Sequence, residues 1–275
     1  LRAELDTILA ISQEKRRNQA LRDYQQRLAS LRFLDPACGS GNFLTETFLS
    51  LRRLENECLK ALLNDQSALD FFDDRIFVNI HQFYGIEIND FAATVAKTAL
   101  WIAESQMVNE TAKILARDID FLPLKSYSNI IEGNALTTDW NTVCPASELS
   151  YIIGNPPFVG RQWRSTEQVK DMELVFDGFG NYGKLDYVCC WYKKAADYML
   201  NTKIKAALVS TNSIVQGESV ATMWKPFFEK YPLQIIFAHR TFRWDSEASI
   251  KAHVHCVIIG FCCYPYEGKK WIFDD

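Results

Sequence analysis

Two consecutive prolines stand directly after an apolar run near the middle of the chain. In the stretch "YIIGNPPFVG" (residues 151–160), the run ends on Asn155, Pro156, Pro157 and Phe158. Prolines neither continue a helix nor donate to a sheet, so the backbone there is held in a stiff, extended turn. We therefore expect this turn to present a polar group with little conformational freedom.

A second stretch, "DPACGSGNF" (residues 35–43), places a carboxylate before a glycine-rich turn. Gly39 and Gly41 would let the backbone approach a ligand, and the helix that follows would point its N–H groups into the same space. A dinucleotide-binding fingerprint needs a third glycine three residues after Gly41, where this chain has Leu44. Asp35 would repel a pyrophosphate but attract the ammonium or sulfonium of S-adenosylmethionine.

Two further polar residues follow apolar runs. Glu87 in "GIEIND" is suited to accept hydrogen bonds from both hydroxyls of a ribose, and Asn134 in "EGNAL" to bond the edge of an adenine. An exposed carboxylate and a plain turn residue are the ordinary alternatives for these two positions. Their order along the chain, after Asp35, favours one shared nucleoside site.

Two loops combine arginines with aromatic residues. "GRQWRST" contains Arg161 and Arg164, and "AHRTFRW" contains Arg240 and Arg243. Such loops suit phosphate contact and base stacking, although partly buried rings in solvated loops give the same pattern. The formal net charge of −4 excludes a broadly basic nucleic-acid coat but not local contacts.

The elements that must position these residues alternate between strands and helices. We predict strands in "LRFLD", "HQFYGIEI", "NIIEGNAL", "SYIIGNPP", "IKAALVST", "LQIIFAHR" and "AHVHCVIIGF". This order predicts an α/β fold with a doubly wound, mostly parallel sheet covered on both faces. The last two strands have no helix between them, so we expect an antiparallel pair at one edge. In such a sheet, ligands bind beyond the carboxyl ends of the strands.

The predicted helices separate these strands. A helical pattern covers residues 1–30, and a long helix begins near Asn42 and ends near Leu63. The next helix, "DFAATVAKTALWIAESQM", has Asp90 placed to cap it. "LDYVCCWYKKAADYML" and "ESVATMWKPFFEKY" are later helices, the second interrupted at Pro226. Residues 159–184 show no clear period and carry Gly178, Gly180 and Gly183, so we expect a mobile functional loop.

The four polar stretches together resemble a known family. "DPACGSGNFL", "GIEIND", "EGNAL" and "GNPPF", in this order, resemble the N6-adenine DNA methyltransferases with the gamma order of motifs. The later segments "LDYVCCWYKKAADY", "LVSTNSIVQGESV" and "IIFAHRTFRWDSEASIKAHVHCVIIGF" are similar to the MmeI-like single-chain restriction–modification enzymes. The resemblance runs from about Leu31 to Phe261.

This resemblance implies a class I, Rossmann-like methyltransferase that uses S-adenosylmethionine and no metal. The Asn155 side-chain oxygen and the Pro156 carbonyl would each accept one N6 hydrogen of an adenine flipped out of double-stranded DNA. Pro157 would stiffen the turn, and Phe158 would stack on the extruded base. The implied cofactor-binding residues are Asp35, Ala37, Cys38, Gly39, Gly41, Asn42, Phe43, Glu87, Ile88, Asn134, Ala135 and Asn155. Arg161, Arg164, Arg240 and Arg243 would contact nucleic acid.

The composition of the whole chain indicates its cellular compartment and its domain organisation. Its eight cysteines contain no Cys-x-x-Cys pair and no export signal precedes them, which favours reduced thiols in a cytoplasmic protein. No apolar run is long enough to span a membrane, and we expect a monomer. The chain lacks an initiator Met, so we interpret it as a fragment: a helical segment at 1–30 and a catalytic domain at 31–275, without target-recognition or nuclease regions.

Three other functions fit parts of the pattern. A protein-glutamine N5 methyltransferase acts on another planar amide nitrogen and could use the same turn, but the arginine-rich aromatic loops favour DNA. A non-catalytic DNA-specificity component need not keep Asn155 and Phe158. A nicotinamide oxidoreductase is disfavoured by Asp35 and Leu44.

Overall fold

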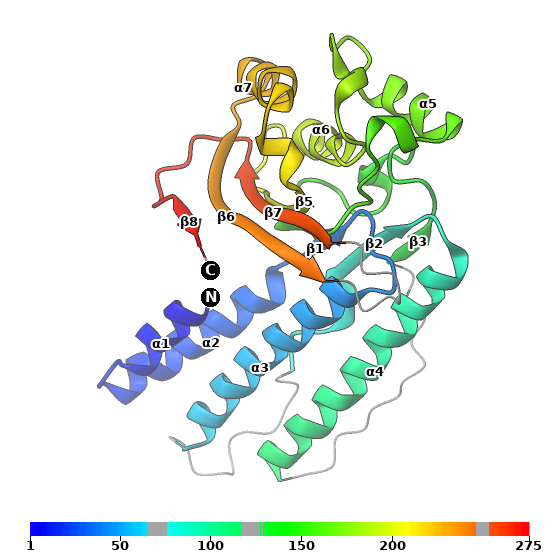
Figure 1. The fold of residues 1–275 in the computed structure, drawn as a ribbon. Coiled ribbons are helices and arrows are strands. Elements are labelled where there is room, and N and C mark those ends of the chain that lie inside the picture. Colours follow the sequence, from blue (N-terminus) through cyan, green and yellow to red (C-terminus); the bar gives the residue numbers. More distant parts are fainter. Residues whose placement is uncertain (65–75, 117–126, 128, 246–252, 275) are drawn as a thin grey trace.

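The computed structural model describes residues 1–64, 76–116, 127, 129–245 and 253–274. Its centre is an eight-stranded sheet in the order β3-β2-β1-β4-β5-β7-β6-β8. The strands are β1 (Phe33–Asp35), β2 (Phe83–Glu87), β3 (Ile130–Glu132), β4 (Tyr151–Gly154), β5 (Lys205–Thr211), β6 (Gln234–Asp245), β7 (His253–Cys262) and β8 (Trp271–Phe273). Strands β1 to β5 run parallel, which confirms the predicted doubly wound sheet (Figure 1).

The far side of the sheet is mixed. Strand β7 runs antiparallel to both β5 and β6, so the predicted antiparallel pair of β6 and β7 is confirmed. Strand β7 lies between β5 and β6, and β8 adds to the outer side of β6 in parallel orientation. The sequence analysis did not predict β8, whose three residues are all exposed and carry no alternating apolar pattern.

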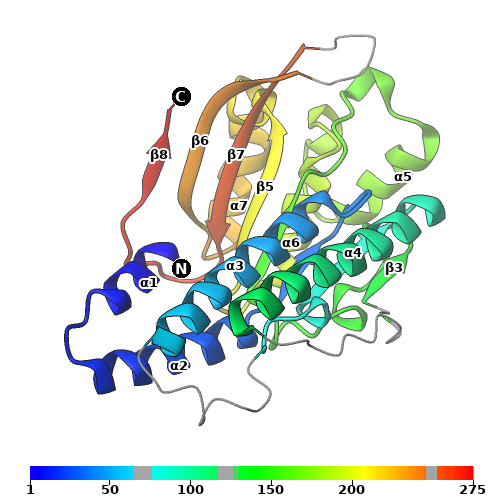
Figure 2. The same cartoon turned by 90° about the horizontal axis from the view of Figure 1, so that it is seen from below.

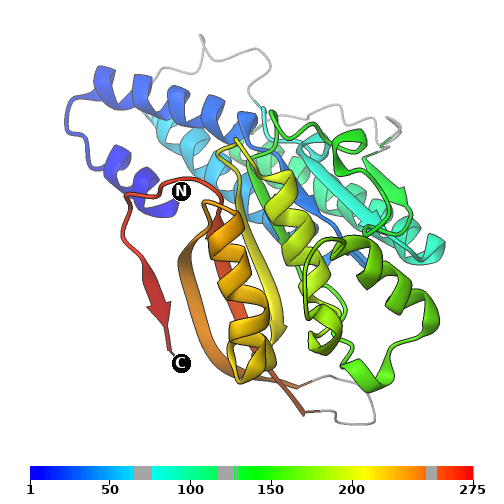
Figure 3. The same cartoon turned by 90° about the horizontal axis from the view of Figure 1, so that it is seen from above.

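Helices cover both faces of the sheet, as Figures 2 and 3 show from opposite sides. Helices α1 (Arg2–Leu9), α2 (Glu14–Ser30), α3 (Asn42–Asn64) and α4 (Asp90–Leu115) cover one face, and α5 (Thr166–Val175), α6 (Cys189–Tyr198) and α7 (Lys225–Lys230) the other. Successive residues of a strand point to opposite faces. Phe33 therefore packs in the core beneath α2 to α4, and Leu34 in the core beneath α6 and α7.

Several predicted elements have different bounds. The predicted helix at residues 1–30 is two helices, because residues 10–13 leave the helical conformation. The side chain of Asn89, not Asp90, caps α4 by accepting the N–H of Ala92. The predicted interruption near Pro226 is confirmed, since a π-helical turn at Val220–Trp224 precedes α7.

Residues 159–184, expected to form a mobile functional loop, are not a loop throughout. This segment contains α5, flanked by short 3-10 helices at Arg161–Trp163 and Tyr182–Lys184. Ser165 and Gln168 form a capping box at the start of α5, and Met172 and Phe176 are buried. The sequence "STEQ" carries this capping signal, so the helix could have been found from the pattern.

The thiols fit the sequence expectation. All eight cysteines are free and buried. No helix within the described ranges is long and apolar enough to cross a membrane.

Candidate active site

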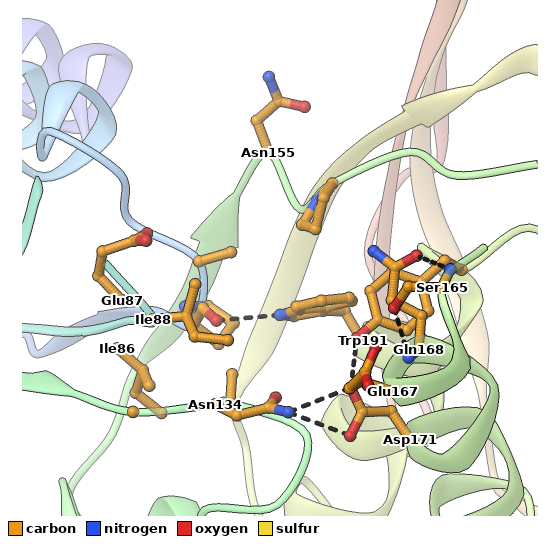
Figure 4. A pocket seen from close by; sticks show the side chains of 16 residues that line it. Ile86, Glu87, Ile88, Asn134, Asn155, Ser165, Glu167, Gln168, Asp171 and Trp191 are labelled. Atoms are coloured by element: carbon orange, nitrogen blue, oxygen red, sulfur yellow. Dashed lines mark hydrogen bonds between the residues drawn. The ribbon is translucent and has the colours of Figure 1, made fainter. Parts of the chain in front are cut away.

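A cavity of about 540 Å³ lies at the carboxyl ends of β1 to β4, where parallel sheets bind ligands (Figure 4). The loops after these strands form one side, and α5 and the start of α6 the other. The lining residues are Pro36, Ala37, Ile86, Glu87, Ile88, Gly133, Asn134, Ala135, Asn155, Pro157, Ser165, Glu167, Gln168, Asp171, Tyr187 and Trp191. The stretches singled out in the sequence after β1, β2, β3 and β4 therefore all contribute to one cavity.

Glu87 lies at the end of β2, and backbone donors fix both of its carboxylate oxygens. Oε2 accepts the N–H of Gly39 at 2.8 Å, and Oε1 accepts the N–H of Asn89 at 2.9 Å. Each carboxylate oxygen has a second lone pair. The carboxylate is thus oriented in advance and keeps acceptor capacity toward the cavity, as a pair of ribose hydroxyls requires.

The glycine-rich turn serves two different purposes. A Cβ on Gly39 would meet no atom within 4 Å, so this position leaves the backbone open to a ligand. A Cβ on Gly41 would lie 2.9 Å from the Cβ of Ala96, so Gly41 is required by packing against α4 rather than by a ligand. Both residues have positive φ angles, which L side chains rarely adopt.

The remaining residues of this stretch divide between cavity and core. Ala37 lines the cavity, whereas the buried Cys38 packs against Gly85 of β2. Asn42 and Phe43 begin α3 outside the cavity lining, and the side chain of Phe43 is partly exposed.

The carboxylate of Asp35 is buried behind the floor that Pro36 and Ala37 form. Its Oδ1 accepts the N–H of Ala37 at 3.0 Å, and a Cβ on Gly154 would lie 2.6 Å from the same oxygen. Burial, and then the charge of Glu87, raise the pKa of Asp35 from 3.8 to about 7, although the hydrogen bond from Ala37 opposes the shift. Asp35 therefore lies behind the cavity rather than in its lining.

The raised pKa of Asp35 predicts a pH-dependent loss of stability. The folded protein holds this proton more tightly than the unfolded chain, so the contribution of Asp35 to the free energy of unfolding falls as the pH rises from about 4 to about 7. Because one pKa unit corresponds to about 1.4 kcal/mol, the loss is at most about 4 kcal/mol. Urea unfolding at pH 4.5 and pH 8 should therefore show a smaller loss for Asp35→Asn than for the unsubstituted protein. Equal losses in the two proteins would show that Asp35 is ionised throughout.

Asn134 is held by a residue that the sequence analysis missed. Its side-chain Oδ1 accepts the N–H of Leu136 at 2.9 Å, while its Nδ2 donates to both oxygens of Asp171 on α5, at 3.0 and 3.1 Å. The hydroxyl of Tyr187 also donates to Asp171, at 2.6 Å. The amide group of Asn134 is therefore fixed in one orientation on the cavity wall.

The turn after β4 places an unsatisfied acceptor at the cavity. The Oδ1 atom of Asn155 is buried and has no hydrogen-bond partner among the described residues. Figure 4 shows Asn155 on the side of the cavity away from Asn134 and Asp171. Pro156 is buried, and Phe158 is half-buried against the core beneath α6. A buried polar atom without a partner costs free energy unless a ligand satisfies it.

Trp191 of α6 is hydrogen-bonded to the cavity floor. Its ring lines the cavity, and its indole N–H donates to the Pro36 carbonyl at 2.9 Å. This hydrogen bond joins α6 to the turn after β1 and so holds that turn in place.

The four arginines predicted to contact nucleic acid lie in different environments. Arg161 is exposed beside the segment that contains α5. Arg164 donates to the Gly183 carbonyl at 2.8 Å and to the sulfur of Met172, and burial lowers its pKa. Arg240 forms an exposed ion pair with Asp274, at 2.6 Å. Arg243 lies exposed on β6, where it pairs in register with His255.

The comparisons with known proteins decide the family. The family model described as "MmeI, DNA-methyltransferase domain" matches residues 11–274, nearly the whole chain. The chain belongs to this family. The resemblance inferred from the four motifs is thereby confirmed, and the match extends beyond it to include all of α2 and β8.

Individual relatives agree with this family. DNA methyltransferase A of Bacillus subtilis is 41% identical over 252 residues, a match that covers 90% of this chain and 28% of the relative. A solved structure of the Type IIL restriction-modification enzyme MmeI in complex with DNA matches with a TM-score of 0.90 and 40% identity, covering 100% of this chain and 36% of that one. A nuclease-deletion mutant of the Type ISP enzyme LlaGI shares the fold, with a TM-score of 0.55 and 15% identity.

The MmeI-type domain described here spans about a third or less of the relatives that it matches. Membership of the family therefore does not by itself assign this chain the activity of those longer relatives, and the activity is inferred from the cavity residues below.

Proposed function

We propose that this chain transfers a methyl group from S-adenosylmethionine to the N6 amine of adenine in DNA, as the modification domain of a restriction–modification enzyme. The observation that carries the proposal is the buried Oδ1 of Asn155, a cavity residue, which has no hydrogen-bond partner among the described residues. This acceptor suits an amine that must give up the planarity of its nitrogen before it can attack.

The residues present fit S-adenosylmethionine. Glu87 offers a fixed carboxylate to the ribose, Gly39 leaves room beside it, and Ile88 adds an apolar wall. Asp35 lies beneath the floor with its pKa raised to about 7, and a bound cation would favour its ionised form. When bound, the cofactor supplies an electrophilic methyl group. Ala37, Asn134 and Ala135 would complete its contacts, while Cys38, Gly41, Asn42 and Phe43 would shape the turn and the helix start around it.

The turn after β4 would prepare the nucleophile. The lone pair of adenine N6 is delocalised into the ring, so the amine is a poor nucleophile while it is planar. Asn155 Oδ1 and the Pro156 carbonyl would each accept a hydrogen bond from one N6–H. These two hydrogen bonds would draw the N6 lone pair out of conjugation with the ring. The two prolines hold these acceptors before the base arrives, so little reorganisation is needed during reaction.

The target adenine must leave the duplex to reach this turn. Flipping costs a few kcal/mol, and stacking on the exposed part of Phe158 would offset some of that cost. Arg161, Arg164, Arg240 and Arg243 would contact phosphates, and at Arg164 and Arg240 the phosphate would replace the contacts with Gly183 and Asp274. We further propose that the protein acts as a cytoplasmic monomer, with residues 1–30 as a helical support for the catalytic domain at 31–275.

A protein-glutamine methyltransferase is the second candidate, because Asn155 would serve an amide nitrogen in the same way. The two functions are separated by offering labelled S-adenosylmethionine together with unmethylated duplex DNA of mixed sequence and a mixture of bacterial proteins. We expect the label to enter DNA and to be absent from protein. Label in protein alone would contradict the proposal.

The cofactor half of the proposal predicts the effect of Glu87→Ala. This substitution removes hydrogen bonds to a charged group and should weaken binding of S-adenosylmethionine by about 1.5–3 kcal/mol, measured by titration calorimetry. Glu148→Ala serves as the control, because Glu148 is an exposed carboxylate paired with Arg32 and does not line the cavity. Unchanged affinity in Glu87→Ala would remove Glu87 from the cofactor site.

A further inference from the structure

Residues 159–187 form a lobe that leaves the sheet beside Asn155 and returns to the same place. At its neck, the N–H of Val159 donates to Asp186 Oδ1 at 3.0 Å, and the N–H of Tyr187 donates to the Val159 carbonyl at 3.1 Å. Within the lobe, α5 buries Met172 and Val175 toward the core beneath α6. The lobe is therefore anchored at both its neck and its helix, and its remaining side forms a wall of the cofactor cavity.

Asp171 is the acidic group on this wall that receives donors from two other elements. Asn134, after β3, donates to both carboxylate oxygens, and Tyr187, before α6, donates to Oδ2. Among the described residues, no cation forms an ion pair with Asp171. Both donors are neutral groups, and the carboxylate oxygens of Asp171 have further lone pairs with which to accept hydrogen bonds beside the cavity.

The orientation of Asn134 determines what this wall can recognise. Its oxygen accepts the N–H of Leu136 and its nitrogen donates to Asp171, so partners on both sides fix the orientation of its amide group. Figure 4 shows the Asn134–Asp171 pair across the cavity from Glu87. If Glu87 holds the ribose, the base extends toward the pair. A carboxylate accepts hydrogen bonds and donates none, so it selects a base edge that carries an amino group and rejects one that carries a carbonyl.

We propose that Asp171 of α5 recognises the 6-amino group of the cofactor's adenine, with Asn134 and Tyr187 as its positioning residues. This inference rests on the proposed function, because it identifies the adenine-specific contact within that cofactor site. The lobe would also connect the two binding sites, because its chain leads from the turn after β4, which would bind the target base, to Asp171.

The test compares S-adenosylhomocysteine with its hypoxanthine analogue, in which a carbonyl oxygen replaces the 6-amino group. Titration calorimetry on the unsubstituted protein should show about 10- to 100-fold tighter binding of the adenine form, as expected for a hydrogen bond to a charged group. In Asp171→Asn, the side-chain amide can turn its nitrogen toward a carbonyl, so the ratio of the two affinities should approach one or reverse. Glu173→Gln is the control, because it removes the charge of an exposed carboxylate on the same helix. It should leave the ratio of the two affinities unchanged.

The ratio separates recognition from a purely structural contact. If Asp171 only fixes α5, Asp171→Asn will weaken both ligands equally and leave the ratio unchanged, which overturns the inference while the proposed function stands. If thermal unfolding shows that Asp171→Asn is not folded, Asp171→Ala is used instead. This variant should also lower the ratio of the two affinities. Failure of the unsubstituted protein to bind S-adenosylhomocysteine contradicts the proposed function, and this inference with it.

Discussion

Substitution of Asn155 by alanine should reduce the rate of methyl transfer by at least about 10²–10³-fold, the loss typical for removal of one preorganised polar contact to a transition state. Asn155 Oδ1 is buried, has no hydrogen-bond partner among the described residues and belongs to a residue that lines the cavity, so we expect it to accept a hydrogen bond from the reacting amine. Affinity for S-adenosylmethionine should change little, since Glu87 and the glycine-rich turn are untouched. The measurement is single-turnover transfer of labelled methyl to DNA, with calorimetry of cofactor binding alongside.

Two substitutions in the same turn serve as comparisons for Asn155→Ala. Asn155→Asp keeps an acceptor oxygen at the position and should retain more activity than the alanine variant. Phe158→Ala removes stacking, which is worth about 1–3 kcal/mol per base, and should slow transfer less than Asn155→Ala. Full turnover in Asn155→Ala would show that the acceptor lies elsewhere.

Substitution of Arg52 by methionine should lower the free energy of unfolding by about 3–5 kcal/mol, because it leaves a buried carboxylate without its counter-charge. Arg52 and Glu55 of α3 form an ion pair whose side chains are 1% and 0% exposed. Arg52 also donates to Thr111 of α4 at 2.6 Å, and Glu55 accepts the N–H of Phe77 at 2.7 Å. The pair thus joins α3, α4 and the segment that leads into β2, and urea unfolding measures its loss.

The double substitution Arg52→Met with Glu55→Gln should recover part of this loss. The glutamine oxygen still accepts the N–H of Phe77, and no unpaired charge stays buried. Glu57→Gln is the matched control on the same helix, because the ion pair of Glu57 with Arg2 is exposed and should contribute little. A loss in Arg52→Met no larger than in the control would mean that water reaches the buried pair.

The parts of the fold that follow local patterns could be predicted from sequence. The strand ends that carry Asp35, Glu87, Asn134 and Asn155 were located correctly, because short apolar runs stop at turn residues. Strand β8 was missed because Trp271 and its neighbours are exposed and lack an alternating pattern.

The roles of individual site residues depended on contacts that no local pattern shows. Gly41 reads as a ligand-approach residue in the sequence, yet its lack of a side chain is required by Ala96, more than fifty residues away. Asn134 reads as a free amide, yet Asp171 holds it from a helix that the sequence analysis treated as a loop. The burial that raises the pKa of Asp35 likewise depends on tertiary packing.

The most direct test of the central claim, that the turn after β4 prepares an adenine amine, is the identity of the methylated nucleoside. Unmethylated duplex DNA of mixed sequence is incubated with the protein and labelled S-adenosylmethionine, digested to nucleosides and separated by chromatography with mass detection. We expect the label to elute with N6-methyldeoxyadenosine and to disappear in Asn155→Ala. Label on a cytosine, or label on adenine that survives in Asn155→Ala, would contradict it.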